Sequence, residues 1–311
     1  MIAPIKRIAV IGAGAMGSAY AEKIYAMDGE SIFFIAAGER YDRLKRSGVV
    51  VNGKHCPIAV IKPEDIQTPF DLLIVAVKHH HLPEAIKDMK QGIGENTCIL
   101  SVMNGIESEE QIAEVYGKDR VLYAVAVGID ALREGNRLTY STPGKLFFGE
   151  ADNHVPSGRV KDLQDFFDGA GIPWQTPDDM VRILWWKFMV NVGMNPVSVL
   201  MRANYGVFQT SGETRALMGA AMKEVIALAE AARVNLSEKD IEDWYTVMEG
   251  LSPHGKTSML QDIEAGRKTE IEMLGGKVTE LGRRYGIPTP VNEALLTIIK
   301  VLERHAMPYL K

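Results

Sequence analysis

Few cysteines, no long apolar run and no marked excess of either charge set the first limits on this 311-residue sequence. Its two cysteines, Cys56 and Cys98, are not spaced as a CxxC redox motif or a metal-binding knuckle, and two do not make a disulfide framework. No uninterrupted apolar run approaches the roughly 20 residues that span a bilayer. Residues 1–7 lack the charged head, apolar centre and cleavage site of a signal peptide. We therefore expect a cytoplasmic protein.

The charge balance also excludes some partners. With 35 basic and 40 acidic residues, the formal net charge of -5 gives no electrostatic reason to bind nucleic acid or an anionic membrane. Apolar residues make up 46% and charged residues 24%, as in ordinary globular proteins. The length suits two domains. A small molecule is therefore the expected partner.

Short apolar strands alternate with helices in the first part of the chain. The apolar runs predict strands at 8–11, 31–36, 72–77, 98–102 and 121–127. Helix-like stretches lie between and after them at 18–27, 84–90 and 107–115. This alternation predicts a Rossmann-like, doubly wound parallel sheet that is covered by helices on both faces.

The pattern changes to helices alone after residue 177. Before that point, a strand pair at 137–149, a helix at 160–167 and an edge strand at 172–175 are predicted. The later helices are predicted at 210–233, 237–250, 271–285 and 291–305. The fold class is thus α/β, with a Rossmann-like domain at 1–178 and an all-helical domain at 179–311.

A glycine-rich turn follows the first strand. Gly12, Gly14 and Gly17 match GxGxxG between a strand and a helix. There the first glycine permits the tight turn, the second lets a pyrophosphate approach, and the third lets helix and strand pack closely. The free amides at the helix start, among them those of Ala15 and Met16, would bind the phosphates. The simpler alternative is a tight turn without a ligand.

The end of the second strand bears on which nicotinamide dinucleotide binds. An acid there would bind the ribose 2′-hydroxyl of NADH, and an arginine would bind the 2′-phosphate of NADPH. The stretch reads Ala36-Ala37-Gly38-Glu39-Arg40, followed by Arg43, Lys45 and Arg46. The excess of basic residues favours NADPH, with Arg40 as a phosphate ligand. Alternatively, Arg40 and Arg43 lie on the solvated face of a helix.

Lys187, Asn191 and Asn195 form one polar stripe on an otherwise apolar helix, because four residues advance about 40° beyond a full turn. Such a stripe is costly unless it meets a ligand, a partner or water. Desolvation would lower the pKa of Lys187 and suit it to general acid catalysis. The simpler alternative is a surface lysine beside a tryptophan. Asn195 precedes Pro196, which predicts a helix break with Asn195 capping a new helix.

Two further polar residues follow predicted strands. Lys78 comes after the strand at 72–77, and Asn104 comes after the strand at 98–102. The carboxyl edge of a doubly wound sheet is where its ligands bind. Asn104-Gly105 is also a common turn signal, so a purely structural role stays open. The run His79-His80-His81 cannot converge on one ion, and no metal is expected.

Thr269 to Glu272 fit a helix-capping box, with Thr269 as the cap and Glu272 as its partner. That leaves Glu270 in the first turn, where the helix dipole favours a carboxylate. There Glu270 would accept a hydrogen bond from a substrate hydroxyl. Alternatively, Glu270 is only a favourable acid at a helix start.

Together these segments resemble the ketopantoate reductases (2-dehydropantoate 2-reductases), in the order and with spacings similar to those of that family. The resemblance implies NADPH-dependent reduction of the ketone of 2-dehydropantoate to (R)-pantoate, a step toward pantothenate and coenzyme A. The segments that carry it are GAGAMG at 12–17, Val77-Lys78, Asn104-Gly105, Trp186-Lys187 with Asn191 and Asn195, and Ser258-Met-Leu-Gln-Asp262 followed by Gly266-Arg267-Lys-Thr-Glu270.

The resemblance also implies residue roles. Lys187 matches the catalytic lysine of the family. Glu270 matches a glutamate that binds substrate, and we expect it also to take part in catalysis and in cofactor binding. Ser258 matches a serine that contacts substrate. The other matches are Asn191 and Asn195, which bind substrate, and Asn104 and Lys78, which lie near the cofactor and the reacting carbonyl.

Two departures from the family pattern affect the expected specificity. Ala37 stands where the family commonly has an arginine for the 2′-phosphate, so Arg40 or Arg43 would replace it, or NADH would be accepted more readily. Met103 stands where a glutamine usually precedes Asn104. The alternatives are a reductase of another branched 2-oxo acid or a non-catalytic NADP-binding regulator. The apolar helices after residue 210 would suit a homodimer.

Overall fold

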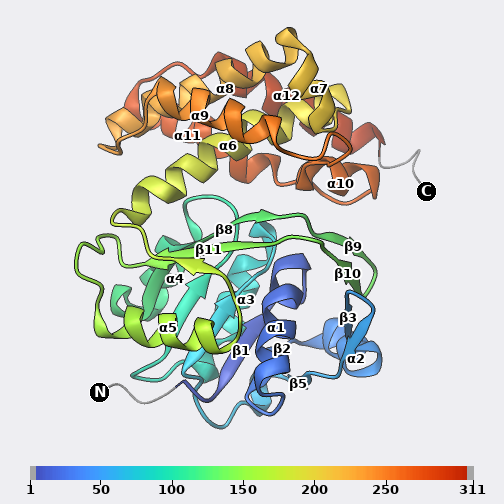
Figure 1. Cartoon of the computed structure of the whole chain (residues 1–311), viewed down its shortest axis with the longest axis vertical. Helices are drawn as coiled ribbons and strands as arrows, with labels where there is room; N and C mark the ends of the chain where they lie inside the picture. The colour runs from blue at the N-terminus through green and yellow to red at the C-terminus, as the bar shows by residue number, and fades with distance from the viewer. Residues whose placement is uncertain (1–4, 307–311) are drawn as a thin grey trace. The chain divides into compact units, whose positions relative to one another are not determined.

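The computed structural model describes residues 5–306, which form two compact units. The first unit ends at Leu184 and the second begins at Trp185. Strands and helices make up the first unit, and helices alone make up the second (Figure 1). The predicted fold class is confirmed. The expected absence of a signal peptide concerned residues 1–7, of which residues 1–4 lie outside the described part of the chain.

The first unit contains an eight-stranded sheet. Its strands are β1 (Ile8–Ile11), β2 (Ile32–Ile35), β5 (Ala59–Ile61), β6 (Leu72–Val75), β7 (Cys98–Ser101), β8 (Val121–Ile129), β11 (Pro143–Gly149) and β12 (Trp174–Gln175). They follow the order β12-β11-β8-β7-β6-β1-β2-β5, and neighbours are parallel except for β11 and β8. The predicted parallel strands are confirmed, and so is the edge strand at β12.

Helices cover both faces of this sheet. Val10 of β1 lies in one buried cluster with Ile24, whereas the next residue, Ile11, lies in another cluster with Leu82. Successive strand residues point to opposite faces, so the sheet is buried on both sides, as predicted. The helices of this unit are α1 (Ala15–Met27), α2 (Gly38–Ser47), α3 (Leu82–Asp88), α4 (Ser108–Tyr116) and α5 (Gly158–Gly169).

The predicted strand pair at 137–149 is wrong, because its two strands belong to different sheets. The first of them, β10 (Arg137–Thr139), joins β3 (Val49–Val51), β4 (Lys54–Cys56) and β9 (Leu132–Glu134) in a four-stranded sheet ordered β4-β3-β10-β9. The second is β11, which pairs with β8. Leu138 of β10 packs with Val51 and with Ala19 of α1, whereas Leu146 of β11 enters the main core. Burial in separate cores overrides the local hairpin pattern.

The predicted helix break at Asn195 is also wrong. Helix α6 (Met180–Met201) is continuous and contains Pro196 in its interior. An interior proline removes a backbone hydrogen bond and costs about 3 kcal/mol. The neighbouring Val197 and Val199 are buried, and each buried aliphatic side chain contributes about 1.5–3 kcal/mol. Packing of the turn that follows Pro196 therefore offsets the cost of the proline.

The start of α6 accounts for the division between the units. Met180 and Leu184 lie in a buried cluster with Val125 of β8. The first turns of the helix therefore belong to the sheet unit, and the expected boundary near residue 178 falls just before them.

The second unit contains all four of the predicted later helices, with shifted ends. One difference is the predicted helix at 271–285, which begins with a π-helical segment, Glu272–Gly276. The helices that follow α6 are α7 (Tyr205–Thr210), α8 (Gly212–Ala231), α9 (Glu238–Glu249), α10 (Ser258–Glu264), α11 (Lys277–Tyr285) and α12 (Pro290–Ala306). Within residues 5–306, no helix has the length and apolar character needed to cross a membrane.

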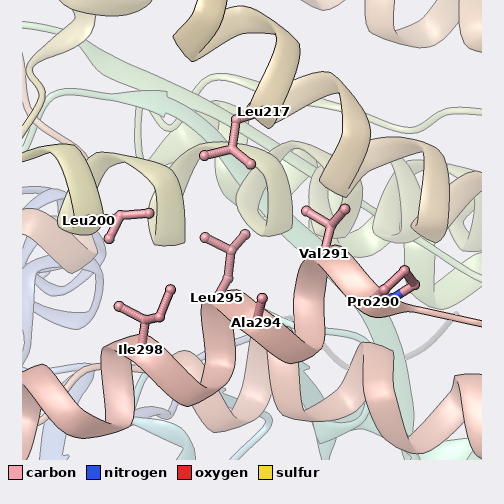
Figure 2. Close-up of a pocket in the computed structure, with 7 residues that line it drawn as sticks. All are labelled: Leu200, Leu217, Pro290, Val291, Ala294, Leu295 and Ile298. Atoms are coloured by element: carbon pink, nitrogen blue, oxygen red, sulfur yellow. The ribbon is translucent and has the colours of Figure 1, made fainter.

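An apolar hollow lies among three helices of the second unit. Figure 2 shows side chains from α6, α8 and α12 lining it. Ile298 of α12 is 39% exposed. Met201, which follows Leu200 at the end of α6, is 47% exposed. The lining residues are Leu200, Leu217, Pro290, Val291, Ala294, Leu295 and Ile298.

We expect Gly17→Ala to unfold the glycine-rich turn, because a Cβ on Gly17 would overlap the carbonyl oxygen of Gly12. Overpacking against a backbone atom should cost about 3 kcal/mol. Urea unfolding followed by circular dichroism measures this loss. The matched control is Gly212→Ala at the start of α8, where an added Cβ meets no atom within 4 Å. Equal stability of the two variants would contradict the proposed close contact.

Candidate functional site

The glycine-rich turn provides an open surface at the start of α1. Gly12 has φ 104°, and a Cβ there would lie 2.5 Å from the carbonyl oxygen of Ala76. A Cβ on Gly14, by contrast, would meet only ordinary contacts at 3.5 and 3.8 Å. Gly14 is the N-cap of α1 and makes no side-chain cap, so the first amides of the helix have no partner within it. These features fit a bound pyrophosphate.

The strand ends next to this turn are level with one another. Ile11 of β1 pairs with Val75 of β6, and Val75 pairs with Ser101 of β7. The segments that leave these strands therefore begin at one edge of the sheet. Lys78 lies on the second of these segments, and Asn104 lies on the third. The structure thus groups Gly12, Lys78 and Asn104 at the carboxyl edge, as the sequence predicted.

Arg40 lies on α2, after the end of β2, and is held by two side chains of the α3 region. Its Nη1 is 3.3 Å from Oε2 of Glu84, and its Nη2 is 3.0 and 3.1 Å from the ring nitrogens of His81. Burial, and then the charge of Arg40, lower the pKa of His81. The ring is therefore neutral at pH 7 and can accept a hydrogen bond from Arg40. A ligand phosphate at Arg40 would compete with the Glu84 carboxylate.

The other basic residues of α2 are solvated. Arg43 and Arg46 are exposed and line a shallow hollow with Glu39 and Asp42. For Arg43, the alternative of a solvated helix face is the better description.

The three consecutive histidines form a short 3-10 helix, His79–His81. The rings of His80 and His81 lie 4.1 Å apart, and His81 contacts Arg40. Within the part of the chain that the structure describes, no group of three or more His, Cys, Asp or Glu residues is arranged to hold a metal ion.

The two asparagines of the polar stripe of α6 are buried in the second unit. Asn191 is 7% exposed and Asn195 is 5% exposed. Lys187 is partly buried in the same helix, where the neighbouring Trp186 packs edge-to-face on Trp244 at 6.0 Å. Burial lowers the pKa of Lys187 to about 8. The ammonium thus releases its proton far more readily than an exposed lysine would.

A hydrogen-bond chain connects Asn195 with the start of α10. The hydroxyl of Ser198 donates to the backbone oxygen of Asn195 at 2.7 Å and lies 2.6 Å from Oγ1 of Thr257. Thr257 caps α10 by accepting from the amide of Leu260. Ser258, the first residue of α10, is exposed beside this cap. The second unit therefore brings together Asn195 and the backbone that carries Ser258.

The predicted capping box at Thr269 is wrong. The hydroxyl and the amide of Thr269 both donate to Oε1 of Glu303 on α12. Glu272 pairs with Lys300 at 3.1 Å and with Lys268 at 3.7 Å, so it does not cap the helix. Charged partners from α12, far along the chain, outcompete the local motif. Glu270 lies between these anchored residues and is 9% exposed.

Glu109 is a buried acid that the sequence did not indicate. It is 4% exposed on α4 and accepts a hydrogen bond from Ser108 at 2.8 Å. Ser108 in turn lies 2.7 Å from the hydroxyl of Ser101 at the end of β7. Burial raises the pKa of Glu109 to about 7. Glu109 lies in an acidic helix start, so its burial is visible only in the folded structure. This network supports the backbone that leads to Asn104.

Comparison with known proteins finds one family along most of the chain. The model of the ketopantoate reductase PanE/ApbA family matches residues 8–153, and its C-terminal model matches residues 179–303. The 2-dehydropantoate 2-reductase of Aquifex aeolicus is 30% identical over 305 residues, covering 96% of this chain and 97% of its own. That of Archaeoglobus fulgidus is 27% identical over 303 residues, covering 96% and 98%.

Solved structures agree with this match. The 2-dehydropantoate 2-reductase of Geobacter metallireducens has a TM-score of 0.84 and 28% identity, covering 95% of this chain and 99% of its own. A D-mandelate dehydrogenase, solved with NADH and anilino(oxo)acetate, has a TM-score of 0.86 at 22% identity, covering 96% and 99%. The second likeness shows a shared fold.

Proposed function

Because this chain belongs to the ketopantoate reductase PanE/ApbA family, we propose that it reduces 2-dehydropantoate to (R)-pantoate with NADPH. Its relatives along almost the whole chain are 2-dehydropantoate 2-reductases, so the chain is an oxidoreductase of the 2-oxo acid-reducing type. The product is a precursor of pantothenate. The cytoplasm is the proposed location, since the cysteine content favours a reducing compartment.

The lowered pKa of Lys187 is the observation that carries the proposed chemistry. A bound reduced nicotinamide would supply a hydride to the carbonyl carbon of the 2-oxo acid. The carbonyl oxygen then takes a proton from the Lys187 ammonium, which becomes a neutral amine, and the product is the 2-hydroxy acid. A donor with a pKa of about 8 is largely protonated at pH 7 and yet gives up its proton readily.

The remaining polar residues are proposed to bind the substrate and the cofactor. Asn191 and Asn195 are buried amides that would hydrogen-bond substrate oxygens, together with Ser258 and Glu270. In the first unit, the backbone of Gly12 to Gly17 would hold the pyrophosphate. Lys78 and Asn104, at the same sheet edge, would lie near the nicotinamide and the reacting carbonyl.

We also propose a homodimer that covers the apolar side chains of the second unit. Ile298 on α12 lines the hollow of Figure 2 and is 39% exposed, and Val301, on the same helix, is 43% exposed. A ketopantoate reductase of Staphylococcus aureus with the same fold is described as dimeric. Light scattering should give a dimer for the parent and a monomer for Ile298→Glu, and a monomeric parent would refute this proposal.

The substrate assignment predicts a clear preference in kcat/KM. Among 2-oxo acids, 2-dehydropantoate should be reduced best, with competitors at least roughly tenfold worse. The test measures kcat/KM from the loss of NADPH absorbance. It uses a panel of 2-oxo acids that includes branched aliphatic and aromatic side chains. The dehydrogenase with the same fold shows that the fold alone does not choose the acid. A better competitor would establish the related reductase instead, and binding of NADPH without any turnover would establish the regulator.

Lys187→Ala should reduce turnover by about 10² or more, because a general acid is lost, while NADPH binding stays nearly intact. In the parent, kcat should fall as the pH rises through about 8, since the ammonium form disappears. Steady-state rates between pH 6 and 10 test both effects. Lys239→Ala is the matched control, because this lysine is exposed and pairs with Asp243. Unchanged turnover in Lys187→Ala would exclude the proton-donor role.

The choice between NADPH and NADH should depend on Arg40 and its carboxylate partner. Arg40→Ala should lower kcat/KM for NADPH roughly tenfold and spare NADH, because one charge-assisted contact to the 2′-phosphate is lost. Glu84→Gln should shift the preference toward NADPH, since it removes the competing carboxylate. Arg43→Ala is the control on the solvated face of the same helix. A constant NADPH to NADH ratio in all three variants would remove Arg40 from the cofactor site.

A further inference from the structure

Arg133 places a cation over the glycine-rich turn. It belongs to β9 in the four-stranded sheet, which the sequence did not predict. Its Nη1 atom lies 3.8 Å from the position that a Cβ on Gly14 would take. Gly14 is the second glycine of the turn, where a pyrophosphate approaches the backbone. The guanidinium thus lies next to the surface that fits the phosphates.

The strand register explains why Arg133 faces this turn. In the hairpin of β9 and β10, Arg133 lies directly opposite Leu138. Opposite residues of an antiparallel pair project from the same face of the sheet. Leu138 is buried in a cluster with Ala19 of α1, and Ala15 at the start of α1 packs against that cluster. The face of the hairpin that carries Arg133 is therefore the face that packs on α1.

The hairpin also limits the freedom of the Arg133 side chain. Its Nε donates to the backbone oxygen of Gly135 at 2.9 Å. Gly135 has φ 62° and lies in the connection between β9 and β10. The bond fixes the inner part of the guanidinium, and the Nη side lies toward Gly14. This arrangement reduces the entropy that Arg133 would lose on binding an anion.

Arg137 in the same hairpin provides an internal contrast. It lies opposite Glu134, one position along from the pair of Arg133 and Leu138, and therefore projects from the other face. Its side chain is exposed. The two arginines carry the same charge and lie in the same four-stranded sheet, but only Arg133 is directed toward α1.

We propose that Arg133 binds the pyrophosphate of the nicotinamide dinucleotide, so that the four-stranded sheet supplies the cation that the glycine-rich turn lacks. This inference rests on the proposed function, because it requires a dinucleotide at Gly12 to Gly17. Backbone amides provide dipoles, whereas a guanidinium adds a full charge and two parallel donors that match phosphate oxygens. The 2′-phosphate belongs at the end of β2, near Ala37, so Arg133 serves NADH and NADPH alike.

Binding titrations of the full-length protein, without any 2-oxo acid, test this assignment. Calorimetry would compare NADPH, NADH and ADP-ribose on the parent, Arg133→Ala, Arg133→Lys and the control Arg137→Ala. Arg133→Ala should weaken all three ligands by roughly tenfold or more, and by similar factors, because all three contain the pyrophosphate. Arg133→Lys should recover part of the affinity, and Arg137→Ala should bind like the parent.

The outcomes separate this inference from the function on which it rests. Equal binding by Arg133→Ala and Arg137→Ala, with a parent that binds all three ligands, would overturn the role of Arg133 alone. A loss confined to NADPH would also overturn it, since that result would place Arg133 at the 2′-phosphate. A parent that binds neither NADH nor NADPH would overturn the proposed function as well. Thermal unfolding of each variant without ligand shows whether a loss of affinity comes from a loss of folding.

Discussion

The close approach of α1 to β1 at the glycine-rich turn is the contact on which the proposed nucleotide-binding edge depends. Gly17 lacks the side chain that would overlap the carbonyl oxygen of Gly12, so the first turn of the helix packs directly on the strand. The amides at the start of α1 thereby reach the edge at which β1, β6 and β7 end in register. Lys78 and Asn104 share that edge because of strand pairing, although neither is close to Gly12 in sequence.

Local patterns in the sequence predicted the parts of the structure that local interactions determine. The GxGxxG turn, the apolar strands and the helical second half were all predicted correctly, because each depends on residues within one element or its neighbours. The errors arose where distant residues decide. Leu138 and Leu146 are close in sequence but bury in different cores, so their strands do not pair. Pro196 stays inside α6 because the surrounding valines are buried.

The candidate site shows the same division. Lys187 and the two asparagines of its stripe could be found from helical spacing, because one helix positions all three. The anchoring of Thr269 by Glu303 and the burial of Glu109 depend on helices that the sequence does not place in space. Burial also acts in opposite directions on the two ionisable groups. It lowers the pKa of the Lys187 cation to about 8 and raises the pKa of the Glu109 carboxyl to about 7.

The four-stranded sheet joins two segments that are far apart along the chain, since β10 pairs in parallel with β3 through Val50 and Val51. Bringing β3 and β10 together closes the long loop of chain between them, which costs conformational entropy. Only the pairing and packing of a few short strands offset that cost. Such a subdomain can open locally while the main sheet stays folded. Opening would withdraw Arg133 from the turn, so the proposed role of Arg133 would link the affinity for a phosphate-bearing ligand thermodynamically to the opening free energy of the small sheet. A bound dinucleotide would then stabilise the closed form of the four-stranded sheet. Dissociation of the dinucleotide would be coupled to the local unfolding equilibrium of that sheet.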